Sequence, residues 1–268
     1  MLLRPRLVTL VVAISLTFLL VPAAFGASTY AGYASHATLR PASLPATLLT
    51  VNSTGVAGYE GAKSSTSPIT YLNASWRQPA VNCTAMNSSV LFDALLSGNT
   101  TELVGGTGVK CVGGVPSSFA WYTLGASNST NVTVISATTL PVPSGSVVRV
   151  SIHVGVVATV KITDGTHSIS KSHASPGIEY VGEVGVLGMP AAGGIMPLAN
   201  FGTLSFGASY THVAGTNDLK VGSVTKGIGA FPFAAKVTMK DTAHKTLCIP
   251  TALVGSSTSF KIVWKAAT

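Results

Sequence analysis

Short stretches of alternating apolar and polar residues recur along the chain and predict β-strands. They are separated by Gly, Pro, Ser and Asp-Gly, and no stretch repeats at a helical period with caps. The expected strands include "ITYLNASW" (69–76), "NVTVISA" (131–137), two strands within 146–163, "THSISKS" after the Asp-Gly turn, "FGTLSFGASYT" (201–211), "AAKVTMKDT" (234–242) and "TSFKIVW" (258–264). This pattern predicts an all-β fold, a sandwich of two antiparallel sheets in a single domain.

Composition narrows the function classes. Charged residues are 9% of the 268 residues and hydrophobic residues are 47%, which excludes a disordered chain. The formal net charge is +8, but the Lys and Arg residues are scattered and form no basic run. We therefore expect no nucleic-acid partner.

The N-terminus has the layout of a secretory signal peptide. Arg4 and Arg6 precede an apolar run that ends in small residues near Ala27. We expect a signal peptide over 1–27, a flexible Ala/Ser/Thr/Pro-rich arm over 28–50, and one sandwich domain over 51–268. The protein would then be secreted; a retained leader would instead anchor it to a membrane.

Two further signals fit an oxidising, extracellular setting. Asn-x-Ser/Thr sequons begin at Asn52, Asn73, Asn82, Asn87, Asn99, Asn128 and Asn131, which predicts a glycosylated surface. Of the three cysteines, Cys83 and Cys111 can close a loop of moderate length, which leaves Cys248 over.

Several common catalytic motifs are absent from the sequence. The Gly-rich stretch 104–114 lacks the Gly-Lys-Ser/Thr ending of a phosphate loop, so we interpret it as a turn at a strand end. The six histidines lack metal-ligand spacing, and there is no Gly-x-Ser-x-Gly elbow. We expect no metal and no cofactor, which leaves carboxylates as the candidate catalytic groups.

Five segments, in order, resemble the glutamic peptidases (eqolisins), secreted acid endopeptidases with a two-sheet β-sandwich fold. They are "NASWRQPAVNCT" (73–84), "TGVKCVGG" with "AWYTLG" (107–125), "IEYVGE" (178–183), "LANFGTLSF" (198–206) and "LCIPTALVGSSTSFKIVW" (247–264). The resemblance covers about residues 50–265 and implies peptide-bond hydrolysis. In that family a glutamate activates water as general base and a glutamine amide stabilises the oxyanion.

The resemblance implies that Glu183 is the general base. Glu179, at the same parity of a strand, would lie on the same face. The family's glutamine position falls at Val104, which cannot donate a hydrogen bond. The substitute donors that we consider are Gln78, the one glutamine of the chain, and Thr123.

Three functions stay open at this point. The first is an acid endopeptidase whose substrate lies along Tyr59, Trp121 and Thr123. The second is a non-catalytic sandwich that binds peptide or polysaccharide with Trp121 as an aromatic platform. The third is an envelope glycoprotein. In each case we expect a monomer, and contact with a membrane only if the leader is retained.

Overall fold

The computed structural model describes residues 48–64, 67–84, 87–98, 101–126, 132–174, 177–191 and 194–268. Its elements are β1 (Leu49–Ser53), β2 (Val56–Gly61), β3 (Ile69–Arg77), β4 (Ser89–Gly98), β5 (Thr101–Val112), β6 (Val115–Ala126), β7 (Thr133–Ile135), β8 (Val147–Val154), β9 (Val157–Asp164), β10 (His167–Ala174), β11 (Glu179–Leu187), β12 (Pro190–Ala191), β13 (Gly194–Ile195), β14 (Thr203–Phe206), α1 (Ala208–Thr211), β15 (Asp218–Val221), β16 (Val224–Gly227), η1 (Ile228–Ala230), β17 (Ala235–Lys240), β18 (Thr246–Pro250) and β19 (Phe260–Trp264). The expected signal peptide and nearly all of the expected arm lie outside the described residues, and β1 begins within the last residues of that arm.

The first layer of the fold has the strand order β1-β17-β2-β11-β4-β5-β6-β7. All of these pairings are antiparallel except β1–β17, which is parallel. Successive side chains of each strand point to opposite faces, so directly paired residues share a face. This rule assigns every residue of the layer either to the interior of the sandwich or to the opposite face.

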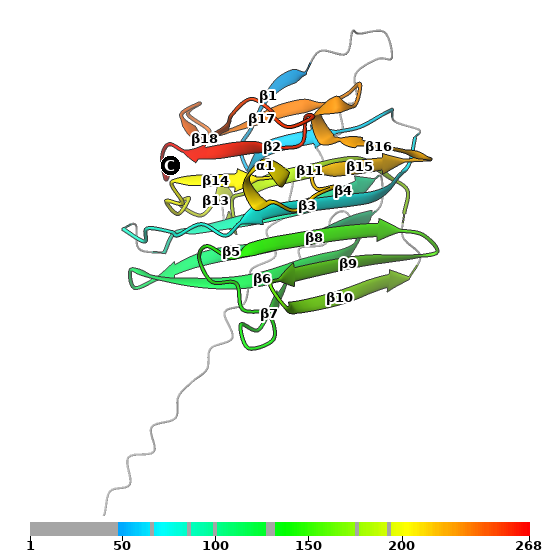
Figure 1. The fold of residues 1–268 in the computed structure, drawn as a ribbon. Coiled ribbons are helices and arrows are strands. Elements are labelled where there is room, and N and C mark those ends of the chain that lie inside the picture. The colour runs from blue at the N-terminus through cyan, green and yellow to red at the C-terminus, as the bar shows by residue number, and fades with distance from the viewer. Residues whose placement is uncertain are drawn as a thin grey trace, which may run out of the picture.

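The second layer has the order β3-β8-β9-β10, and in Figure 1 these four strands run side by side. The other edge of β3 pairs with β15 and β14, and β15 continues to β16. Pairing then runs from β14 through β19 and β18 to β17, so both layers belong to one curled 17-stranded sheet. The predicted all-β sandwich is confirmed.

The main core fills the space between the two layers. It contains Phe92 and Val184 from the first layer and Trp76, Val150 and Val160 from the second. Trp76 is fully buried and its indole NH donates to Thr107 Oγ1 at 3.1 Å. The alternation of side chains along each strand thus determines which residues pack between the two layers.

At Gly105 the two layers pack closely against each other. A Cβ atom added there would lie 2.6 Å from Val160 Cγ1 and 3.0 Å from Val150 Cγ1. The glycines of 104–112 therefore belong to a long strand, β5, and the turn is confined to the next two residues, Gly113 and Gly114. The predicted turn at a strand end is present at Gly113 and Gly114, whereas the glycines within 104–112 make room for packing and do not bend the chain.

The cysteines confirm the expected pairing. Cys83 and Cys111 form a disulfide with their Cα atoms 5.4 Å apart. Cys248 is a buried free thiol whose pKa burial raises well above its ordinary value. None of the helices in the described residues is long and apolar enough to cross a membrane.

Candidate functional site

The candidate site lies on the face of the first layer that points away from the main core. We call it the carboxylate face, because Glu60 of β2, Glu183 of β11, Asp93 of β4 and Glu102 of β5 share it. Its apolar residues form a second, smaller core made of Val56, Leu91, Leu95, Val104, Trp121, Leu187, Met189 and Val237. Strand pairing alone brings these carboxylates together, since they come from four neighbouring strands.

Glu183 stands at the centre of this face. It pairs directly with Glu60 across β2 and with Leu95 across β4, and it is 2% exposed. Burial raises the pKa of Glu183 well above its ordinary value, and the Asp93, Glu60 and Glu102 carboxyls raise it further. The Oε1 atom of Glu183 has no hydrogen-bond partner within the described part of the chain.

Asp93 lies diagonally across from Glu183, because its direct partner on β11 is Gly185. Its partner on β5 is Gly106, so the carboxyl has a glycine on each side along the sheet. Asp93 is fully buried, and neither carboxyl oxygen has a hydrogen-bond partner among the described residues. Burial and the nearby Glu102 raise the pKa of Asp93 well above its ordinary value.

Glu60 and Glu102 complete the group. Burial raises the pKa of Glu60 from 4.5 to about 7. Burial, followed by the charge of Glu179, raises the pKa of Glu102 from 4.5 to about 8. All four carboxyls on this face therefore favour their protonated forms at acid pH.

Glu179 does not share this face in the simple way that alternation predicts. The register shifts between Glu179 and Val181, so Glu179 pairs with Gly98 whereas Glu183 pairs with Leu95. Such a β-bulge interrupts the alternation of side chains. Glu179 is buried at the strand end, accepts a hydrogen bond from the Thr101 hydroxyl, and has a pKa raised by burial to about 7.

Beyond Glu60 and Glu183, the row of directly paired residues carries no charged side chain on β4, β5 or β6. Across β4, β5 and β6 it continues as Leu95, Val104 and Thr123, all directly paired and all buried. Val104 thus lies on the same face as Glu183, two strands away. Trp121 is 2% exposed in the neighbouring row, and its indole NH donates to the Thr107 carbonyl at 3.0 Å. It packs inside the smaller core and does not form an open platform.

Gln78 and Tyr59 are not brought to Glu183. The Thr107 hydroxyl donates to Gln78 Oε1 at 2.7 Å, and Thr107 alternates with Val104 onto the opposite face of β5. Tyr59 likewise points into the main core, where its hydroxyl donates to the Thr251 carbonyl at 2.6 Å. Neither residue can act as oxyanion donor or substrate contact on the carboxylate face in this structure.

The sequons differ in their environment. Asn52, Asn82 and Asn87 are exposed, whereas Asn99, Asn128 and Asn131 lie outside the described residues. Asn73 is 1% exposed; its amide donates to the Gly215 carbonyl, and its Oδ1 accepts from Arg149 Nε at 3.0 Å. The prediction that Asn73 is glycosylated is therefore wrong for the folded chain, because this buried amide has no room for a glycan.

Sequence reasoning missed Glu60, Asp93 and Glu102. Each stands inside an apolar strand, in "VAGYEG", "LFDALL" and "TELVGG". A carboxylate in an apolar strand is costly to bury, so this context was the available signal. Among the described residues, no group of three or more His, Cys, Asp or Glu side chains is arranged to hold a metal ion.

Solved structures of glutamic peptidases match this arrangement of strands. Scytalido-glutamic peptidase with a transition state analog inhibitor aligns with a TM-score of 0.61 at 12% identity, over 79% of this chain and 98% of that one. SCP-B, a member of the eqolisin family of peptidases in complex with the tripeptide Ala-Ile-His, aligns with a TM-score of 0.56 at 12% identity, over 79% of this chain and 98% of that one. Aspergilloglutamic peptidase from Aspergillus niger aligns with a TM-score of 0.52 at 14% identity, over 66% of this chain and 99% of that one.

The chain has the glutamic-peptidase fold. No protein-family model matches the sequence, and no curated protein is similar to it. The similarity to glutamic peptidases therefore lies in the path of the backbone.

Proposed function

We propose that the protein is a secreted hydrolase of peptide bonds that works with a cluster of buried carboxyls. The observation that carries this proposal is the grouping of Glu183 with Asp93 and Glu60 on the carboxylate face. The chain has eight Asp and Glu residues, and four of them are buried on this face. Burying carboxyls together destabilises the fold, so such a cluster indicates a functional site. The glutamic-peptidase fold supports the choice of a peptide substrate by analogy.

In the proposed reaction, Glu183 takes a proton from a water molecule as the resulting hydroxide attacks the peptide carbonyl carbon. The protonated Asp93 donates a hydrogen bond to the oxyanion that forms. The proton held by Glu183 then passes to the leaving nitrogen as the C–N bond breaks. A carboxylic acid kept neutral by burial can replace an amide as the donor.

We expect this chemistry above the acid range, because the general base must first lose its proton. The base must be ionised while its neighbours stay protonated, so the cluster must lack one proton. The pKa values of Glu60 and Glu102 are raised to about 7 and about 8, and those of Glu183 and Asp93 are raised well above their ordinary values, so the cluster loses its first proton only above the acid range. The family resemblance implies activity in acid, so the pH profile of the rate distinguishes the two expectations.

A non-catalytic function is the second candidate, and the row beside Glu183 favours it. Leu95 and Val104 are apolar and buried where a peptidase site needs polar groups. The same fold would then bind a peptide without cleaving it.

Secretion belongs to the same proposal. The Cys83–Cys111 disulfide persists in oxidising compartments, and the exposed Asn52, Asn82 and Asn87 are available to glycosylation. Mass spectrometry of the purified secreted protein would detect glycans on these three residues and none on Asn73.

Digestion of casein between pH 3 and pH 9 tests the proposed hydrolysis. We expect wild type to cleave and Glu183→Gln to lose at least about a hundredfold in rate, because glutamine cannot accept the proton. Asp241→Asn is the matched control, since Asp241 lies in the turn after β17 and its Oδ1 accepts from Lys245 N, which asparagine can preserve. Background rates for wild type across the whole range would reject the proposal and leave the non-catalytic function.

A further inference from the structure

The outer face of the second layer carries an ordered row of polar side chains. Direct strand pairing aligns one residue from each of six strands, in the order β16-β15-β3-β8-β9-β10. The row consists of Thr225, Lys220, Tyr71, His153, Thr159 and Ser172. Six strands at about 4.8 Å spacing make the row about 24 Å long. That length exceeds a small metabolite and suits a polymer.

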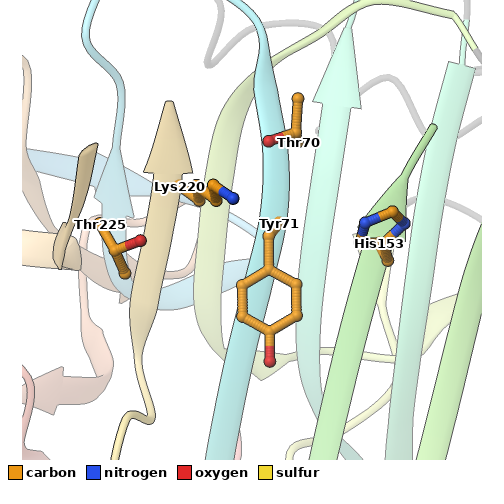
Figure 2. A pocket seen from close by; sticks show the side chains of 5 residues that line it. All are labelled: Thr70, Tyr71, His153, Lys220 and Thr225. Atoms are coloured by element: carbon orange, nitrogen blue, oxygen red, sulfur yellow. The ribbon is translucent and has the colours of Figure 1, made fainter. Parts of the chain in front are cut away.

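A shallow pocket of about 290 Å³ lies in this row. It is lined by Thr70, Tyr71, His153, Lys220 and Thr225, which Figure 2 shows projecting from neighbouring strands. The Tyr71 ring is half-buried between Lys220 and His153, both of which are exposed. One flat ring flanked by hydrogen-bond donors and a cation is suited to a sugar unit that carries an acidic group.

The charge of this face favours an anionic partner. Arg77, Arg149 and Lys161 point outward from β3, β8 and β9, and all three are exposed like Lys220. Asp218 is the one described carboxylate at an outward position of these strands, and it is half-buried. The face thus presents four cations against one partly covered anion.

The hydroxyl groups distinguish a polysaccharide from other anionic polymers. Thr225, Thr159 and Ser172 offer donors and acceptors that match sugar hydroxyls. Single-stranded nucleic acid is bound by several stacked aromatic rings, and this row has Tyr71 alone.

We propose that the outer face of β16, β15, β3, β8, β9 and β10 binds an anionic polysaccharide, with an acidic sugar seated at Tyr71 and Lys220. This site lies on the opposite layer from the carboxylate face. The proposal is therefore independent of whether the protein hydrolyses peptides.

Calorimetric titration with heparin and with polygalacturonate at 50 and 200 mM NaCl tests this proposal. We expect wild type to bind at least one of them, sulfate and carboxylate being the two sources of charge, and to bind more weakly at the higher salt. The Lys220→Gln/Lys161→Gln variant should weaken binding at least about tenfold, a loss of about 1.4 kcal/mol. Tyr71→Ala should weaken binding at both salt concentrations, since its contact carries no charge.

Lys226→Gln is the matched control. Lys226 is exposed on β16 but alternates with Thr225 onto the other side of the strand, so binding should be unchanged. Equal weakening by this variant would attribute binding to net charge and overturn the proposal. So would the absence of binding to both polymers, or equal binding to single-stranded DNA or anionic lipid vesicles. Thermal unfolding of each variant confirms that a loss of binding is not a loss of fold.

Discussion

Asp93 shows how single residues shape the proposed site. The glycines on either side of it, Gly106 and Gly185, are closely packed, since a Cβ atom added to either would lie within 2.4 Å of a backbone carbonyl oxygen. Glu183 lies at the diagonal position on β11, two residues from Gly185. A buried acid and a buried base candidate thus lie diagonally across from each other on two neighbouring strands.

Val104→Gln tests the missing amide at the residue scale. The new side chain would lie on the same face as Glu183, two strands or about 10 Å away across the sheet. We expect kcat/KM for casein to rise about tenfold, because a preorganised amide adds a donor for the oxyanion. Val104→Leu should leave the rate unchanged, and an equal or lower rate in Val104→Gln, with the fold intact, would show that this row is outside the site.

The elements explain which predictions succeeded. Alternation is visible in "ITYLNASW" and in 146–163, and it correctly predicts β3, β8 and β9. It fails in β5, where glycines that accommodate the facing layer resemble a turn.

The site was less predictable than the fold, because register between distant strands is not visible in one sequence. Glu183 was found through the family resemblance. Glu60 was not predicted, because it becomes a neighbour of Glu183 only through the pairing of β2 with β11. The bulge after Glu179 was equally hidden, and parity alone therefore misplaced that carboxyl.

Gly105→Ala tests the packing of the two layers. The added methyl would come within 2.6 Å of Val160 Cγ1, so we expect the free energy of unfolding to fall by about 1–3 kcal/mol. Gly55→Ala is the control, because a Cβ there has nothing within 4 Å and its unfolding should change by less than about 0.5 kcal/mol. Urea unfolding of both variants measures the difference; equal values would mean that the layers are not in close contact at Gly105.

At the scale of the whole molecule, the buried carboxyls link stability to pH. A carboxyl whose pKa is higher in the folded state than in the unfolded chain binds its proton more tightly when folded. The stabilisation is complete below the unfolded value of 4.5 and is lost as the pH rises through about 7 and about 8. The protein should therefore be more stable in mild acid than at neutral pH.

Thermal unfolding between pH 4 and pH 9 checks this expectation. We expect Tm to fall by at least about 5 °C between pH 5 and pH 8, which corresponds to about 2 kcal/mol for a domain of this size. Glu60→Gln/Glu183→Gln should flatten the dependence, because the amides do not ionise. A Tm that rises over this range would mean that the carboxyls are stabilised in their charged forms.

The activity of two Asp93 variants tests the central claim that a protonated carboxyl serves as the oxyanion donor. Casein cleavage rates for wild type, Asp93→Asn and Asp93→Ala should be measured from pH 4 to pH 9. The asparagine amide still donates but does not ionise, so Asp93→Asn should stay active and lose the decline that wild type shows at high pH. Asp93→Ala should fall by about a hundredfold or more. Equal rates and pH profiles for the alanine variant and wild type would contradict the account.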